Sequence, residues 1–162
     1  MYLGIDAETL EIRTIEVTSN RIGDAQFLPG LLNQIPHDET IALVSADSAY
    51  DTKRSHGTIA ERGADAIIPV SKNGKPWKEN TPGAHVRNET LRATQGLRRS
   101  LWKKWRDYHR RSLVEAKMRC FKCLGESVMA HLFNSLVAEP QIREALLNRF
   151  TQLGTPITIA MP

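Results

Sequence analysis

The sequence predicts a mixed α/β domain in which helices cover a sheet. Three observations support this: an alternating pattern near the N-terminus, two short apolar runs in the first half, and long stretches with helical spacing in the second. The resulting order is strand, strand, helix, strand, helix, strand, helix, which is typical of a mixed sheet flanked by helices. With 162 residues, 41% of them hydrophobic, the chain is long enough for one domain with a sizeable core.

The N-terminal segment is predicted to form a β-hairpin. Residues 2–5 would end one strand, residues 6–9 would form a turn, and residues 10–18 alternate as a second strand does. A loop over 19–24 follows, in which Asp24 is a candidate N-cap. A helix is expected over 25–34, although Pro29 and Gly30 interrupt its pattern, and Pro36 would end it.

A short apolar run at residues 40–46 predicts a strand buried on both faces. It ends at Asp47, and ligands of open α/β sheets bind just beyond the carboxyl ends of strands. Asp47 is therefore a candidate for chemistry, with a turn or capping role as the alternative. Asp51 is the candidate N-cap of a helix over 52–62, which would stop at Gly63.

A further strand is predicted at residues 66–70, followed by a polar, basic loop over 71–78. In that loop Lys72 and Lys75 either bind a ligand or lie on an ordinary surface loop. Residues 79–98 show no firm periodicity and are expected to be loop with short helical pieces.

The second half is predicted to contain two helices. The first runs from residue 97 or 100 to residue 124, with Gly125 as its C-cap. The second covers residues 127–150, is broken in two by Pro140, and packs its apolar stripe on the basic helix; His131 on that stripe is expected to be structural. Residues 151–162 would fray.

One face of the predicted basic helix combines an acid, two cations and a phenol. With Glu115 at 0°, Arg111 lies near −40°, Tyr108 near +20° and Lys122 near −20°, at about 100° per residue. The expected apolar back holds Leu113, Cys120 and Leu124. Such a front suits a metal ion beside a phosphate, because the acid can bind the metal and the cations the phosphate oxygens.

The charge of the chain is concentrated in this region. Residues 98–122 hold ten lysines and arginines, including Arg119, and two acids, so they carry +8 while the other 137 residues sum to −4. Two tryptophans, a tyrosine and a histidine interleave with the cations, which favours nucleic-acid binding over a plain solvated face. The cysteines, Cys120 and Cys123, have no second pair for a zinc site, and no run of 18 apolar residues exists. Reduced thiols and the lack of a membrane span predict a cytoplasmic protein.

The spacing of Tyr108, Arg111, Glu115 and Lys122 resembles the signature of DDE transposases of bacterial insertion sequences, of the IS4/IS5-type group. Two upstream segments, residues 46–51 and the loop after the strand at 66–70, resemble further motifs of that family. The resemblance covers nearly the whole chain, with a partial catalytic domain over 1–153 and a tail over 154–162. It implies a ribonuclease H-like mixed sheet that lacks the first strand.

The resemblance also implies roles for particular residues. Asp47 and Glu115 would be the second and third catalytic carboxylates and would bind Mg²⁺ or Mn²⁺. Arg111 and Lys122 would hold DNA phosphates, and Tyr108 would position the helix or the backbone. Lys72, Lys75 and Arg119 are further candidate DNA contacts. Partners would be the insertion-sequence ends and target DNA, with a second copy or a missing N-terminal part.

The first carboxylate of the triad decides between three hypotheses. In the family it lies on the strand before this hairpin, whereas Asp6 falls in a turn. The leading hypothesis is therefore the C-terminal part of a transposase catalytic domain, inactive alone. The second is a complete small nuclease that uses Asp6, Asp47 and Glu115. The third is a non-catalytic DNA-binding remnant or regulator of a full-length transposase.

Overall fold

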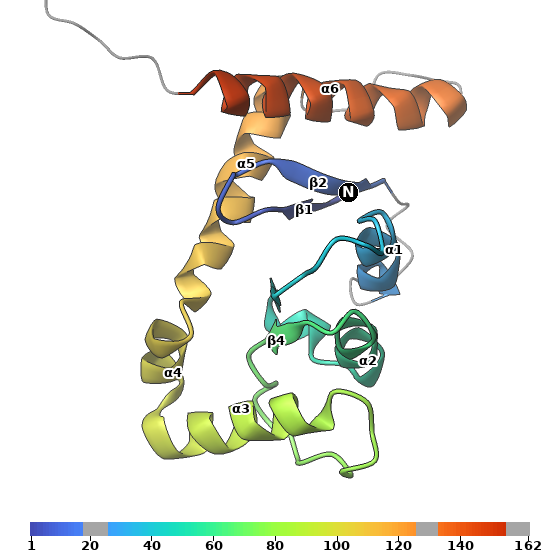
Figure 1. The fold of residues 1–162 in the computed structure, drawn as a ribbon. Helices are drawn as coiled ribbons and strands as arrows, with labels where there is room; N and C mark the ends of the chain where they lie inside the picture. The colour runs from blue at the N-terminus through green and yellow to red at the C-terminus, as the bar shows by residue number, and fades with distance from the viewer. Residues whose placement is uncertain (18–25, 126–132, 155–162) are drawn as a thin grey trace, which may run out of the picture. The chain divides into compact units, whose positions relative to one another are not determined.

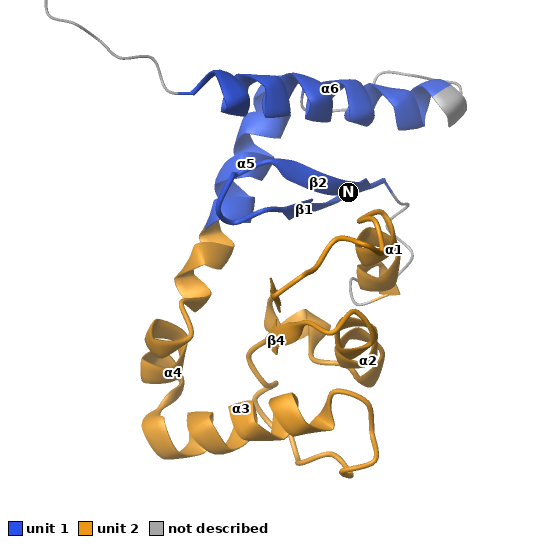
Figure 2. Ribbon diagram, viewed as in Figure 1, with its two compact units in different colours: residues 1–17, 113–162 blue, residues 18–112 orange. Residues whose placement is uncertain are grey.

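The computed structural model describes residues 1–17, 26–125 and 133–154, which form two compact units (Figures 1 and 2). Unit 1 comprises residues 1–17 and 113–162, and unit 2 comprises residues 18–112. The elements are β1 (Tyr2–Ile5), β2 (Ile12–Glu16), α1 (Leu28–Asn33), β3 (Leu43–Ser45), the 3₁₀ turn η2 (Ser48–Tyr50), α2 (Lys53–Glu61), β4 (Asp65–Ile67), α3 (Ala84–Leu97), α4 (Arg99–Trp105), the 3₁₀ turn η3 (Tyr108–Arg111), α5 (Ser112–Cys123) and α6 (Phe133–Leu153). No helix in these described ranges is long and apolar enough to cross a membrane.

The predicted hairpin is confirmed in unit 1. Strands β1 and β2 pair antiparallel, with Tyr2 opposite Glu16, and the second strand is shorter than the alternation suggested. Asp6 closes the turn, because its Oδ1 accepts hydrogen bonds from the backbone N–H groups of Glu8 (2.7 Å) and Thr9 (3.0 Å). The predicted loop over 19–24, Asp24 and His131 lie outside the described residues.

The core of unit 1 joins the hairpin to α5 and α6. Its buried members are Leu3, Ile12, Phe121 and Leu147. Asn148 of α6 makes two hydrogen bonds to the backbone of Ile12: its Oδ1 accepts from the N–H (2.7 Å) and its Nδ2 donates to the C=O (2.8 Å). Since this backbone N–H and C=O would otherwise be unpaired at a sheet edge, Asn148 docks α6 on β2 as a further strand would.

Helix α6 runs through Pro140 without a break, so the predicted division there is wrong. A proline inside a helix removes one backbone hydrogen bond. The Pro140 side chain is fully buried, and Arg143 in the next turn pairs with Glu139 and donates to the Gly125 carbonyl (2.7 Å). We attribute the continuity of the helix to this packing.

The core of unit 2 lies between α1, α2 and the parallel pair β3–β4. It contains Leu28, Leu32, Ile59, Ala64, Ala66 and Ile68. The prediction that the strand at 40–46 is buried on both faces is wrong: β3 spans three residues, and Leu43 is 51% exposed. Helix α1 has Pro29 in its first turn, where a missing backbone N–H leaves no helical hydrogen bond unmade. Helix α2 is followed by Gly63 with φ +67°, and the prediction that the helix stops at Gly63 is confirmed.

Residues 84–97 form helix α3, so the prediction of a loop with short helical pieces is wrong. The buried face of α3 includes Arg87, Asn88 and Thr90 as well as Ala84 and Leu91. A search for apolar residues at helical spacing cannot detect a helix whose buried face is largely polar.

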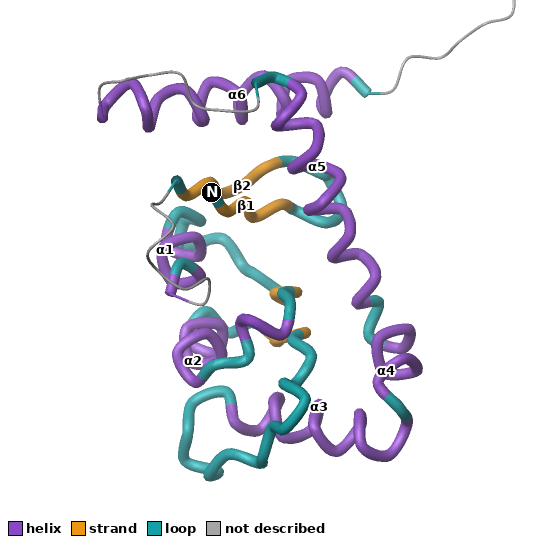
Figure 3. Tube along the Cα trace, turned by 180° about the vertical axis from the view of Figure 1, so that it is seen from behind, coloured by secondary structure: helices purple, strands orange, loops and turns teal. Residues whose placement is uncertain are grey.

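The predicted continuous helix to residue 124 is also wrong, because α4, η3 and α5 are separate. Positive φ angles at Arg98 (64°) and Asp107 (50°) interrupt the chain on both sides of α4 (Figure 3). An α-helix requires a negative φ, so it cannot continue through either residue. Tyr108 and Arg111 therefore belong to a 3₁₀ turn, and the α-helical angles that placed them on one face with Glu115 do not apply to them.

Candidate functional site

Asp47 lies two residues after β3, at the carboxyl end of the parallel pair in unit 2. Its Oδ1 accepts a hydrogen bond from the Ala49 N–H (2.8 Å), so it caps η2, the alternative role that the sequence suggested. Its Oδ2 lies 3.9 Å from Nη2 of Arg111, and the Asp47 side chain is 43% exposed. A capping carboxylate of this exposure keeps oxygen lone pairs that can bind a ligand.

Arg111 lies near Tyr108 as well as near Asp47. The Arg111 guanidinium lies 6.0 Å from the centre of the Tyr108 ring, and Lys103 Nζ lies 5.0 Å from it. The buried Trp102 also lies next to this ring, with 6.1 Å between ring centres. Tyr108 thus lies between cations of η3 and α4 and the buried Trp102.

Glu115, Arg119 and Lys122 all lie on α5 and are exposed, with Glu115 in the first turn and Lys122 in the last. Glu115 and Lys122 are seven residues apart and share a face of this helix. The predicted apolar back is wrong in detail. Cys120 is exposed and Leu124 is 40% exposed, whereas Phe121 is the buried side chain of α5.

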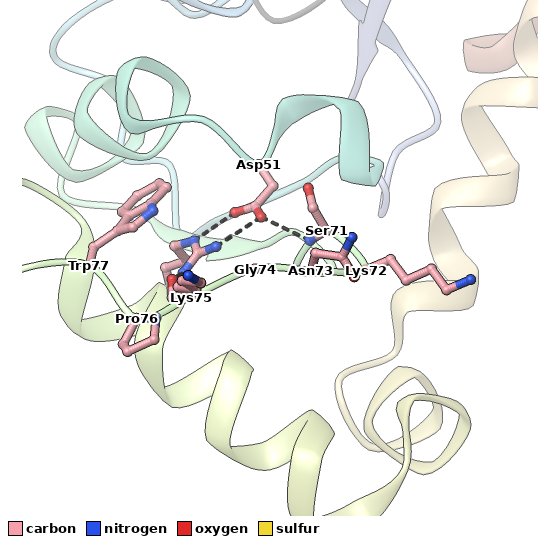
Figure 4. A pocket seen from close by; sticks show the side chains of 9 residues that line it. Asp51, Ser71, Lys72, Asn73, Gly74, Lys75, Pro76 and Trp77 are labelled. Atoms are coloured by element: carbon pink, nitrogen blue, oxygen red, sulfur yellow. Dashed lines mark hydrogen bonds and ion pairs between the residues drawn. The ribbon is translucent and has the colours of Figure 1, made fainter.

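The loop that follows β4 lines a cavity of about 600 Å³ with Asp51 and Arg87 (Figure 4). Lys72 and Lys75 are both exposed at this cavity, and the Lys72 side chain extends away from Asp51. A Cβ on Gly74 would lie 2.3 Å from Val70 Cγ1 and 2.9 Å from Arg87 Nη2. The close approach of the loop to Arg87 therefore requires glycine at position 74.

Asp51 anchors this loop instead of capping α2. The N-cap of α2 is Thr52, whose side chain accepts from the Ser55 N–H, so the predicted capping role of Asp51 is wrong. Asp51 Oδ1 accepts from Arg87 Nε (2.9 Å), and its Oδ2 accepts from the Ser71 N–H (2.9 Å) and from Arg87 Nη2 (3.2 Å). The two side chains are 1% and 3% exposed. They form a buried, bidentate ion pair between the segment just before α2 and the first turn of α3.

Arg87 connects this pair to the rest of the loop. Its Nη1 donates to the Lys75 carbonyl (2.7 Å), and its guanidinium lies 4.2 Å from the centre of the Trp77 ring. Asn88, the next residue of α3, exchanges two hydrogen bonds with the backbone of Trp77. The loop that carries Lys72 and Lys75 is thus held at Ser71, at Lys75 and at Trp77.

The pKa of Asp51 is held well below its usual range. Burial by itself would raise the pKa, but the nearby His56 ring, the hydrogen bonds from Arg87 and the Ser71 N–H, and the charge of Arg87 together outweigh the burial. His56 Nε2 lies 3.4 Å from Asp51 Oδ1, an ion-pair distance without good hydrogen-bond geometry, and its ring packs edge-on against Trp77. Asp51 is therefore a carboxylate with a fixed charge.

A family model described as the transposase DDE domain matches residues 1–147. The chain belongs to the DDE transposase domain family. Membership implies DNA transposition as the function and DNA as the substrate. No solved structure matches this transposase domain.

Members of the DDE family typically use divalent metal ions, and the donor chemistry of the candidate residues fits such ions. Asp47 and Glu115 both offer hard carboxylate oxygens at positions that solvent reaches, which suits Mg²⁺ or Mn²⁺. Among residues 1–17, 26–125 and 133–154, no three His, Cys, Asp or Glu side chains form a group that could hold a metal ion. Asp47 belongs to unit 2 and Glu115 to unit 1.

Proposed function

We propose that this chain is the C-terminal part of the catalytic domain of a bacterial insertion-sequence transposase, with a ribonuclease H-like fold. The observation that carries the proposal is the family match over residues 1–147, joined to the approach of Arg111 to Asp47 within unit 2. An acid and a cation 3.9 Å apart at the end of a parallel strand suit a phosphodiester substrate.

Asp47 and Glu115 are the proposed catalytic carboxylates and would hold Mg²⁺ or Mn²⁺. The bound ions would activate the attacking water or 3′-hydroxyl and stabilise the leaving oxygen. Asp47 is suited to this role because its capping bond to the Ala49 N–H fixes Oδ1 and so orients the carboxylate. Glu115 presents its carboxylate from the first turn of α5, where the helix dipole favours a negative charge.

The cations would bind and orient the DNA backbone. Arg111 would hold a phosphate beside Asp47, Lys122 would hold one on the face of α5 that carries Glu115, and Tyr108 would position the turn that carries Arg111. Lys72, Lys75 and Arg119 would add phosphate contacts, the first two from the loop that Asp51 and Arg87 hold in place. Because the loop is already held in one conformation, less conformational entropy is lost when DNA binds to it.

We further propose that the chain does not cleave DNA on its own. Asp6, the candidate for the first carboxylate of the triad, uses Oδ1 to close the hairpin turn, which supports a structural role for it. Incubating the purified chain with linear DNA and Mn²⁺ should leave the DNA uncut. Cleavage that is lost in both Asp6→Asn and Glu115→Gln would contradict this and favour the complete nuclease.

DNA binding itself should be strong at low salt and fall steeply as salt is added. Removing one phosphate contact lowers the slope of log affinity against log salt by about 0.9, so Arg119→Ala and Lys122→Ala should each have that effect on any duplex sequence. Lys53→Ala is the matched control, because Lys53 is exposed on α2 and has no proposed role. Equal slopes for all four proteins in a fluorescence-anisotropy titration would contradict the assignment.

The alternative function is a non-catalytic DNA-binding remnant or a regulator of a full-length transposase. The observation in its favour is the charge of residues 98–122, which needs no catalytic group to attract DNA. The same titration separates the two. For the transposase site, Mg²⁺ should raise affinity for DNA and Asp47→Asn should abolish the increase, whereas a plain binding module is indifferent to both changes.

A further inference from the structure

Helix α4 carries two tryptophans in opposite environments. Trp102 is 1% exposed and packs against Tyr108, whereas Trp105 is 70% exposed. An indole ring is among the largest apolar groups that a fold can bury, and its exposure brings no benefit to folding. Burial within unit 2 therefore accounts for Trp102, whereas Trp105 stays largely exposed to solvent.

The surroundings of Trp105 are cationic. The last turn of α4 contains Lys103 and Lys104, and Arg106 follows directly. Lys104, which directly precedes Trp105, is exposed, and Asp107 is the one acid close in sequence. An exposed aromatic ring can stack on another flat ring, and the neighbouring cations can bind phosphates. A partner that carries both groups would therefore fit this surface.

We propose that Trp105 is a stacking site for an unpaired base of single-stranded DNA. Bases within a duplex have both faces covered by their neighbours, so a surface indole reaches a base face only where the strand is unpaired. Stacking on an aromatic side chain tolerates any base, while nearby lysines and arginines bind the backbone. This inference rests on the proposed function and adds a preference for unpaired DNA near its cleavage or joining point.

The test compares three 20-nucleotide probes: a single strand, its duplex, and a single strand in which central bases are replaced by abasic sites. Trp105→Ala should weaken binding to the intact single strand about 5- to 140-fold, the range for loss of one stacked base. It should change binding to the duplex and to the abasic strand little, because both keep their phosphates.

Two further variants keep the test decisive. Trp105→Phe preserves a ring and should retain most of the affinity for the single strand. Leu101→Ala is the matched control, because Leu101 is 55% exposed on the same helix and has no ring. The single strand should also quench the tryptophan emission of the wild type, and in Trp105→Phe, where Trp77 and Trp102 remain, the quenching should be smaller.

The outcomes separate the two proposals. If the wild type binds none of the probes at low salt, the proposed function fails and the stacking site fails with it. If it binds all three with a steep salt dependence and Trp105→Ala weakens them equally, DNA binding stands and the stacking site is wrong. An emission change with polyglutamate as large as that with the intact strand would assign Trp105 to an acidic protein partner and overturn the inference.

Discussion

Replacing Asp51 with asparagine should lower the free energy of unfolding by about 3–5 kcal/mol. The change keeps the shape of the side chain and leaves the guanidinium of Arg87, whose side chain is 3% exposed, without a counter-ion. Uncompensated charge in an interior costs far more than a lost surface contact. Urea unfolding followed by tryptophan emission measures the effect, and Trp77, which packs against Arg87, should report it locally.

A matched control and a second variant define the cause. Glu89→Gln removes an acid from the same helix, where Glu89 and His85 are 58% and 83% exposed, and should cost less than about 0.5 kcal/mol. Arg87→Met combined with Asp51→Asn should recover part of the loss, because no buried charge then remains. If the free energy of unfolding of the double variant falls by the sum of the two single-variant decreases, Asp51 and Arg87 are not coupled.

The pH dependence of the Asp51→Asn effect has a definite sign. The folded pKa of Asp51 is depressed, so folding favours the charged carboxylate. Its contribution is fully present above the unfolded pKa of about 3.9 and is lost as the pH falls through the folded pKa. The difference between wild type and Asp51→Asn should therefore be constant near neutral pH and shrink below about pH 4.

The sequence predicts those parts of this chain in which local chemistry and burial agree. Alternation marks the hairpin, because β1 and β2 bury one face, and Gly63 ends α2 because it takes the left-handed φ that such a stop needs. Helix α3 could not be predicted, because its buried face holds Arg87 and Asn88. Their partners, Asp51 and the backbone of the loop after β4, make burial of these groups favourable, and no local pattern identifies those partners.

The candidate site follows the same rule. Spacing and the family resemblance picked out Asp47 and Arg111, and the structure brings these two together within unit 2. Asp51 looked like a helix cap because aspartate is common at that position, and its partner Arg87 lies 36 residues further along the chain. Local periodicity does not predict a contact between residues that are far apart in the sequence.

The second large effect is expected at Phe121, the buried residue of α5. Phe121→Ala should cost about 3–5 kcal/mol, because the ring is 0% exposed among Leu3, Ile12 and Leu147, and its removal leaves a cavity. The helical-wheel prediction placed the apolar back at Cys120 and Leu124, and Leu124→Ala is therefore the informative control. Since Leu124 is 40% exposed, its loss should cost under about 1 kcal/mol.

Amide hydrogen exchange can localise the effect of Phe121→Ala, because Phe121 packs only with residues of unit 1 in the described core. The hairpin amides of β1 and β2 should lose protection, among them the Ile12 N–H that donates to Asn148. The Ala46 N–H, which donates to the Ile67 carbonyl in unit 2, should keep its protection if the two units unfold separately. Equal loss at both amides would show that the units unfold as one, and Asp51→Asn would then expose the hairpin as well.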